Sequence, residues 1–342
     1  MPDPVPDWTG LGRDTAERYR EMARDGYGAI SPSYARLAAA AADDAQLLAG
    51  LETLPAMKRQ PNLLMGAVRY LGGPVDTWRS FRDFLGDRWG DVADVMRVRR
   101  TQTNEAARCT ALLPVLAGLP QPLALLEVGA SAGLCLYPDR YAYRYTSSGA
   151  AHEVGDGSVT LPCATTGPAP LPSTVPHVRW RGGLDLNPLD VSDDDDVRWL
   201  ESLIWPEEVE RFARLHAAVA IARADPPRIA QGDLVHDLLG VVEQVPPDVM
   251  LVVFHTAVLA YVDPAGRAAF REAVAGLAGQ RPTCWVANEA PGIVGSVPPP
   301  AHGAGRFVLA VDERPIAFAG QHGASLDWFD DAQVQRPLQV CT

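Results

Sequence analysis

The stretch LALLEVGASAGLCL, residues Leu123 to Leu136, joins a short apolar run to a turn built from small residues. The run contains one acid, Glu127, and the turn Gly129-Ala130-Ser131-Ala132-Gly133 follows it. A buried parallel strand reads as a continuous apolar run, and glycines at its end let the chain turn sharply and approach a ligand closely. The stretch therefore predicts a strand, a turn and the start of a helix.

Such a turn suits two kinds of site. In a nucleotide-binding α/β domain, N–H groups of the turn face the ligand and an acid at a strand end accepts hydrogen bonds from it. In a serine hydrolase, the pattern G-x-S-x-G exposes a serine hydroxyl above the sheet. Gly129, Ser131 and Gly133 match that pattern literally, so residues outside the stretch have to decide between the two.

Composition indicates a soluble globular protein that acts on a small molecule. The chain has 342 residues, of which 47% are hydrophobic and 21% charged, as is ordinary for globular domains. Its net charge of −12 and its lack of a basic run argue against a nucleic-acid partner. The five cysteines are widely spaced without a C-x-x-C pair, which suggests neither a disulfide framework nor a zinc site.

The sequence shows no targeting or membrane segment. It lacks the basic segment and apolar core of a signal peptide, and no apolar run approaches the ~20 residues of a membrane span. We therefore expect a cytoplasmic protein that makes no membrane contact. The oligomeric state is not indicated.

Residues 1–120 are expected to form an all-helical N-terminal domain that caps the site and selects the substrate. Apolar residues recur there at helical spacing, and no strand pattern precedes Leu123. Polar side chains gather just before one of the apolar helices. Gln102, Asn104, Glu105 and Arg108 are candidates for binding substrate, although Asn104 also suits a helix cap.

Residues 121–342 are expected to form a Rossmann-like cofactor-binding domain of the α/β class. Apolar strands alternate with helical segments, which predicts a mostly parallel sheet, and a β insertion is expected at about 140–182. An antiparallel hairpin should end the sheet. The strands expected beyond the insertion are one ending at Asp185, then Arg228–Asp233, Val249–His255 and Thr283–Ala287, and the hairpin Arg306–Val311 with Pro315–Ala319.

Acids follow two of these strands. Asp185 has the place of the acid that accepts the ribose hydroxyls in doubly wound nucleotide-binding domains, and Asp190 competes for that role. Gly232-Asp233 follows the next strand. A turn-forming acid before a loop is the simpler interpretation of either position.

Over residues 122–329, the chain resembles the class I S-adenosylmethionine-dependent methyltransferase fold. The resemblance rests on four features in this order: Glu127-x-Gly129-x-Ser131-x-Gly133, Asp185, Gly232-Asp233 and the final hairpin. The fingerprint of that fold is E-x-G-x-G-x-G, and Ser131 stands where its central glycine is usual. The chain also resembles a bacterial family of unassigned function in which Gln-Thr-Asn-Glu precedes Glu-Val-Gly-Ala-Ser-Ala-Gly.

The resemblance to the methyltransferase fold implies a site for each part of S-adenosylmethionine. Glu127 and the turn from Gly129 to Gly133 would hold the methionine part, and Asp185 the ribose hydroxyls. Asp233, with the N–H of Leu234, would bind the adenine.

The resemblance also implies which residues face the methyl group. His255, at the end of the fourth strand, would be the general base, because an ordinary histidine is largely neutral at pH 7. Tyr261 lies beyond it, and Asn288-Glu289 ends the fifth strand as a second polar candidate. For His255, a structural hydrogen-bonded role is an equal alternative.

The expected function is methyl transfer from S-adenosylmethionine to an oxygen or nitrogen of an unidentified small-molecule acceptor. One alternative is a non-catalytic protein that binds S-adenosylmethionine or another nucleotide. A less favoured alternative is a serine hydrolase that uses Ser131, because such enzymes place strands before the serine and the residues before Leu123 read as helical. Its acid and histidine would be Asp312 with His322, or Asp263 with His302.

Overall fold

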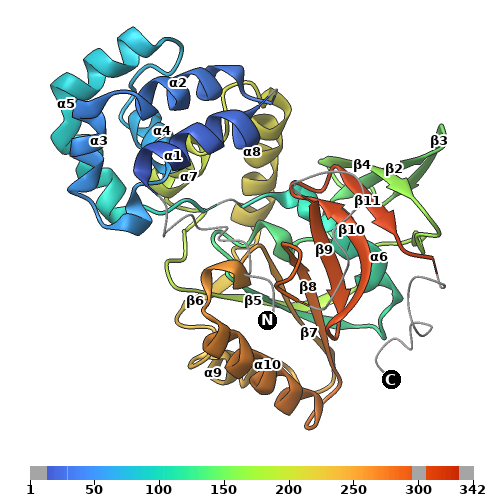
Figure 1. Ribbon diagram of the computed structural model, residues 1–342. Coiled ribbons are helices and arrows are strands. Elements are labelled where there is room, and N and C mark those ends of the chain that lie inside the picture. Colours follow the sequence, from blue (N-terminus) through green and yellow to red (C-terminus); the bar gives the residue numbers. More distant parts are fainter. Residues whose placement is uncertain (1–13, 29, 103, 295–305, 331–342) are drawn as a thin grey trace, which may run out of the picture. The chain divides into compact units, whose positions relative to one another are not determined.

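The computed structural model describes residues 14–28, 30–102, 104–294 and 306–330. These residues form two compact units (Figure 1). The first unit comprises the chain up to residue 102 together with Ser192–His216. The second comprises Asn104–Val191 and the chain from Ala217 onward. The second unit contains the predicted strand and turn.

The first unit is helical, as its sequence periodicity predicts. Acids and a threonine cap several of its helices: the carboxylate of Asp44, for example, accepts a hydrogen bond from the N–H of Leu47 at 2.9 Å. The helix at 78–98 has non-helical backbone at Arg88. The α-helices that lie wholly in this unit are α1 Thr15–Glu21, α2 Pro32–Ala42, α3 Ala45–Glu52, α4 Pro61–Tyr70, α5 Trp78–Val98 and α7 Asp194–Ser202.

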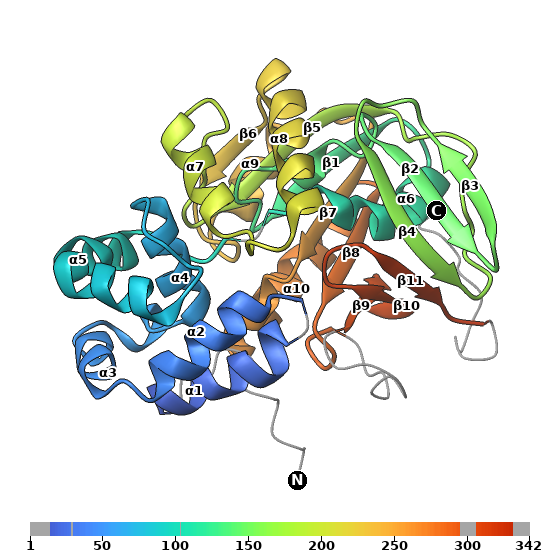
Figure 2. The same ribbon diagram turned by 90° about the horizontal axis from the view of Figure 1, so that it is seen from above.

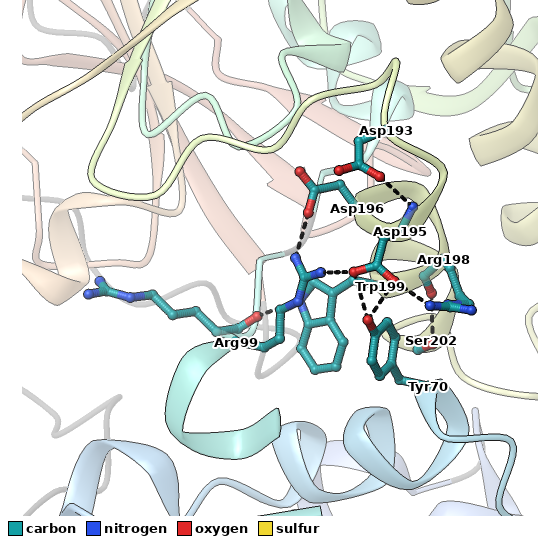
Figure 3. Close-up of polar contacts among 9 residues, drawn as sticks. Tyr70, Arg99, Asp193, Asp195, Asp196, Arg198, Trp199 and Ser202 are labelled. Carbon is teal, nitrogen blue, oxygen red and sulfur yellow. Dashed lines mark hydrogen bonds and ion pairs between the residues drawn. The ribbon is translucent and has the colours of Figure 1, made fainter. Parts of the chain in front are cut away.

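Helix α7 belongs to the helical unit although it comes late in the chain, and a polar network holds it there (Figure 3). Arg99, just after α5, pairs with Asp195 and Asp196 in the first turn of α7. The hydroxyl of Tyr70, at the end of α4, donates to the carboxylate of Asp195 at 2.6 Å. The indole N–H of Trp199 donates to a backbone oxygen beside Arg99. These long-range contacts connect α4, α5 and α7.

The acidic run Asp193 to Asp196 forms the start of α7. Asp193 is the N-cap residue, and its carboxylate accepts a hydrogen bond from the N–H of Asp195 at 2.8 Å. The three acids in the first turn also suit the positive end of the helix dipole. The pairing of the run with Arg99 was not predicted, because it joins residues almost a hundred positions apart.

The second unit is built on a mixed sheet of 11 strands within the described residues. Five parallel strands form its centre in the order β6-β5-β1-β7-β8, and β9, β10 and β11 continue the sheet beyond β8. The prediction of a largely parallel sheet with antiparallel strands near the C-terminus is confirmed. The central and C-terminal strands are β1 Leu123–Val128, β5 Val178–Asp185, β6 Arg228–Gln231, β7 Met250–Thr256, β8 Thr283–Glu289, β9 Arg306–Val311, β10 Arg314–Gly320 and β11 Ser325–Trp328.

Apolar helices cover one face of the central strands. The core on this face joins alternate strand residues such as Leu126, Val253 and Trp285 to Leu238 of α9 and Phe270 of α10. Strands β1, β7 and β8 are buried along their whole length, which explains why they read as continuous apolar runs. The remaining helices of this unit are α6 Cys109–Gly118, α9 Leu238–Val242 and α10 Pro264–Ala278, and α8 Val209–Ala224 crosses between the two units.

The predicted hairpin and β insertion are both present. Asp312 and Glu313 have φ values of +46° and +64°, as a two-residue turn between twisted strands requires. The insertion forms β2 Ala142–Ser147, β3 Ala150–Val154 and β4 Thr160–Thr166. Figure 2 shows these strands at the opposite end of the sheet from β6. Strand β4 pairs with β11 and so joins the insertion to the main sheet, which no local pattern predicts.

None of the described helices combines the length and the apolar character that crossing a membrane requires.

Candidate functional site

The candidate site lies where the central sheet changes direction. The chain passes from β1 to β5 on one side and from β7 to β8 on the other, while β1 and β7 are neighbours. In open α/β sheets, ligands bind outside the carboxyl ends of the strands at such a switch point. The turn after β1 and the loop after β7 occupy these ends. A Cβ at Gly129, where φ is +70°, would lie 2.3 Å from Cγ2 of Val258 in the loop, so only glycine fits there.

Asp185 lies directly beside this turn, at the end of β5. One oxygen of its carboxylate accepts a hydrogen bond from the N–H of Ser131 at 2.8 Å, and the other accepts one from the N–H of Asn187 at 2.7 Å. The sequence places Ser131 and Asp185 54 residues apart, and the parallel pairing of β1 with β5 brings them together. The predicted ribose acid and the predicted cofactor turn are thus neighbours.

The turn uses most of its own N–H groups within the protein. Those of Gly129 and Ala130 donate to the carbonyl of Leu184, that of Ser131 donates to Asp185, and that of Gly133 donates to Ala130. A phosphate cradle needs several N–H groups that point at the ligand. The geometry of this turn therefore does not match a pyrophosphate site.

Asn104, predicted to contact substrate, holds the turn in place. Its amide nitrogen donates to the carbonyl of Ala130 at 3.0 Å, and its amide oxygen accepts from the N–H of Leu134 at 2.8 Å. Glu105 caps the short helix Ala106–Arg108, where its carboxylate accepts from the N–H of Ala107. Gln102 is half-buried and lies in the helical unit. Asn104 and Glu105 thus stabilise the turn and the short helix.

Arg108 joins the end of β7 to the loop after β10. Its Nη1 donates to the carbonyl and the hydroxyl of Thr256 at 3.1 and 3.2 Å, and its Nε donates to the carbonyl of Gln321 at 2.9 Å. The guanidinium also lies 5.7 Å from the centre of the Phe307 ring. Arg108 is thus a buried cation at the carboxyl end of the central sheet.

Glu127, the residue before the last one of β1, is almost completely buried, with 1% of its surface exposed. Its Oε2 makes no hydrogen bond with any residue that the structure describes. Burial raises the pKa of this carboxyl well above its usual range, the nearby Cys135 raises it further, and Arg108 lowers it. A buried carboxyl with an unused oxygen is suited to bind a polar or cationic group of a ligand.

The hydroxyl of Ser131 is also buried, and it has no hydrogen-bond partner among the described residues. The φ of Ser131 is +52°, a conformation that the serine of a hydrolase elbow can adopt. A serine nucleophile needs a base within hydrogen-bond distance, and none of the described histidines bonds this hydroxyl. Asp263 instead caps α10, and Asp312 bonds the N–H of Trp285. His302 lies outside the described residues.

His255 is completely buried and held from both sides. Its Nε2 lies 2.9 Å from the indole nitrogen of Trp285, and its Nδ1 lies 2.6 Å from Oε1 of Glu289. An indole nitrogen only donates, so Nε2 must accept and Nδ1 must carry the proton. In this arrangement neither ring nitrogen is free to take a proton from a substrate.

Glu289 connects this buried pair to the loop after β7. The same Oε1 accepts hydrogen bonds from the N–H groups of Val258 and Leu259 at 2.7 and 3.0 Å. The loop begins at Ala257, whose φ of +60° is strained for a residue with a side chain. Sequence reasoning missed this role of Glu289, because no local pattern shows that a strand-end acid will bond a loop 30 residues earlier.

The remaining predicted residues lie in turns around the site. Tyr261, in the short helix Leu259–Tyr261, has 60% of its side chain exposed. Asp233 follows β6, and its carboxylate accepts from the N–H groups of Val235 and His236. The N–H of Leu234 has no partner among the described residues. Within the same residues, no group of His, Cys, Asp and Glu side chains has a metal-binding arrangement.

Comparison with known proteins places the chain in a family. The sequence profile of a family described as "Uncharacterized protein conserved in bacteria (DUF2332)" matches residues 16–328. The chain belongs to this family. The match spans the described parts of both compact units, so the helical unit is a part of the family's architecture. A search of curated proteins finds no match.

Proposed function

We propose that this member of the family binds S-adenosylmethionine at the carboxyl ends of β1, β5 and β6 and transfers its methyl group to a small-molecule acceptor. The order of the five parallel strands supports the proposal. Numbered by their position among these strands, β6-β5-β1-β7-β8 becomes 3-2-1-4-5, the order of doubly wound nucleotide-binding domains. The glycine turn follows the first of these strands, as it does in those domains.

The observation that carries the proposal is the unpaired Oε2 of Glu127 beneath a turn that has little free N–H. A dinucleotide brings a pyrophosphate, which needs more free N–H donors than this turn offers. The methionine part of S-adenosylmethionine brings an ammonium and a sulfonium instead. Their positive charge favours the ionised form of Glu127, which then attracts both groups. The chemistry of the site therefore favours S-adenosylmethionine over NAD.

The residues present fit the other parts of this cofactor. Each oxygen of the Asp185 carboxylate accepts one backbone N–H and has a further lone pair for a ribose hydroxyl. The Asp233 carboxylate and the N–H of Leu234 offer an acceptor and a donor side by side, which suits the amino edge and a ring nitrogen of adenine. Leu186, beside Asp185, exposes about half of its side chain and offers an apolar surface.

When bound, S-adenosylmethionine supplies an electrophilic methyl group, which passes to a nitrogen or oxygen of the acceptor while the sulfur keeps the bonding electron pair and the acceptor's proton goes to water. The protein's part is mainly orientation. We assign His255 a positioning role instead of the general-base role that the sequence suggested, because Glu289 and Trp285 occupy both ring nitrogens. Through Glu289, the pair fixes the loop after β7 against Gly129. Tyr261 keeps its predicted place near the methyl group, since its side chain is exposed beside this loop.

A ligand panel tests the proposal. Thermal unfolding is measured with S-adenosylmethionine, S-adenosylhomocysteine, methylthioadenosine and NAD, because a ligand that binds the folded state raises Tm. We expect the two ligands with a methionine part to raise Tm most, methylthioadenosine to raise it less, and NAD to have no effect. A larger effect of NAD would contradict the proposal. Transfer of a labelled methyl group to an acceptor then separates an enzyme from a non-catalytic binding protein.

A further inference from the structure

Asn288, near the end of β8, has a buried amide without a partner. The side chain is completely buried, yet neither Nδ2 nor Oδ1 makes a hydrogen bond with any residue in the described ranges. The backbone carbonyl of Asn288, in contrast, is paired: it accepts a hydrogen bond from the N–H of Ala257 at 3.0 Å. Because the large majority of buried polar side-chain atoms in proteins are paired, two unpaired atoms on one amide call for a partner beyond the described residues.

The register of the strands places this amide on the same face of the sheet as Glu127. Glu127 is paired with Phe254 on β7, and Thr256, two residues further, is paired with Asn288 on β8. Side chains two residues apart on a strand share a face, as do directly paired residues of parallel neighbours. Glu127, Thr256 and Asn288 therefore form a polar line across the carboxyl ends of β1, β7 and β8.

This line is buried, and further polar groups lie next to it. The apolar helices α9 and α10 pack on the opposite face, against Leu126, Val253 and Ala287. On the polar face, Arg108 donates to the hydroxyl of Thr256. Glu127 adds an unpaired carboxyl oxygen to the two unpaired amide atoms. The polar line thus contains a carboxyl and an amide with unused hydrogen-bonding atoms, and the cation of Arg108 lies beside it.

We propose that Asn288 is the recognition residue of an acceptor subsite for a small neutral molecule with an amide or lactam group. An amide side chain presents a donor and an acceptor side by side, so it pairs with a group that presents the same two in reverse. The N–H of the ligand bonds Oδ1 and its C=O bonds Nδ2. The identity of this molecule as the methyl acceptor rests on the proposed function, because it depends on a methyl donor bound over Glu127 on the same face.

The subsite makes a prediction about stability that a structural amide would not. An unpaired buried amide destabilises the folded chain, so an apolar residue of similar size should stabilise it. We expect Asn288→Leu to raise Tm by about 1–3 °C. Asn104→Leu is the matched control, because both amide atoms of Asn104 are paired and its loss should lower Tm.

The decisive experiment combines this pair of variants with NMR of the side-chain amides. The signal pair that is missing from the spectrum of Asn288→Leu identifies the Asn288 amide in the wild-type protein. We expect this pair to shift on addition of 2-pyrrolidone and not on addition of cyclopentanone, which has the same ring shape without the N–H.

Two results would overturn the inference. A lower Tm for Asn288→Leu would mean that the amide is already paired, for example by a buried water. An Asn288 signal that does not respond to the lactam at saturating concentration would exclude amide recognition. A separate titration of the wild-type protein with S-adenosylhomocysteine tests the proposed function. If that titration shows no binding while the lactam shifts the signal, the subsite stands and the methyl donor does not.

Discussion

The carboxylate of Asp185 accepts a hydrogen bond from the N–H of Ser131, with 2.8 Å between the oxygen and the nitrogen. This bond joins the end of β5 to the turn after β1, at the carboxyl edge of the sheet. It also fixes Ser131 at a φ of +52°, a region that residues with a side chain rarely adopt. The buried carboxyl of Glu127 lies near the end of β1, just before the same turn. Two acids from the adjacent strands β1 and β5 therefore lie next to one turn.

The charge of Glu127 should make stability depend on pH. Burial raises the pKa of this carboxyl, so above the ordinary value of about 4.3 the unfolded chain loses the proton while the folded chain keeps it. The folded wild type therefore loses stability as the pH rises, by up to about 1.4 kcal/mol per pH unit within that window. Glu127→Gln removes this loss. Urea unfolding from about pH 5 to pH 8 should show the variant gaining on the wild type as the pH rises, and a constant difference would contradict this assignment.

The proton of His255 should be on Nδ1. The indole of Trp285 donates to Nε2, and Glu289 lies next to Nδ1. Nitrogen NMR of the imidazole distinguishes the two tautomers directly. We expect a protonated Nδ1 and an unprotonated Nε2 at neutral pH. Trp285→Phe removes the indole donor and is the control, in which this preference should weaken. A proton on Nε2 in the wild type would reopen the general-base role.

The network at the start of α7 should stabilise the helical unit except in acid. A hydrogen bond from Tyr70 is the largest cause that lowers the pKa of Asp195, and Arg198 and Arg99 lower it further. A lowered pKa means that the stabilisation is present above the ordinary carboxyl value and is lost as the pH falls through the lowered one. Because 39% of the Asp195 side chain is exposed, we expect Tyr70→Phe to cost only about 1 kcal/mol at pH 7.

Urea unfolding at pH 7 and in acid measures this cost, and it should disappear once Asp195 is protonated. The same substitution in an Asp195→Asn background completes a double-mutant cycle. A cost of equal size in both backgrounds would show that the hydroxyl of Tyr70 acts through a group other than Asp195.

Ser131 should be replaceable by glycine. Ser131→Gly restores the E-x-G-x-G-x-G pattern and removes a side chain from a left-handed backbone position. The stability should change by less than about 1 kcal/mol, and the affinity for S-adenosylhomocysteine should not fall. The wild-type protein should not react with a fluorophosphonate probe. Covalent labelling of the wild type that the glycine variant lacks would instead support the hydrolase.

Much of the fold was predictable because it follows from local pattern. The apolar runs of β1, β7 and β8 are buried from end to end, and the turn at Asp312-Glu313 closes the expected hairpin. The pairing of β4 with β11 and the packing of α7 with α4 could not be predicted in the same way. Both depend on contacts between segments more than 120 residues apart, for which no sequence period exists.

The site was predictable in its residue types more than in their roles. Glu127 and Asp185 were singled out by their positions after apolar runs, and the structure brings both to the turn. The partners of His255 and Asn104 could not be predicted because each is distant in sequence: Glu289 for the histidine and Ala130 for the asparagine. Hydrogen-bond pairing of this kind is a property of the packed chain and leaves no local pattern.

Calorimetric titration with S-adenosylhomocysteine tests the central claim most directly. Asp185→Asn and Asp190→Asn are compared with the wild type, because Asp190 is an exposed acid five residues from Asp185. We expect the wild type and Asp190→Asn to bind with similar affinity, and Asp185→Asn to bind at least about tenfold more weakly, a loss of about 1.4 kcal/mol. No binding by the wild type, or equal weakening by the two variants, would contradict the proposed cofactor site.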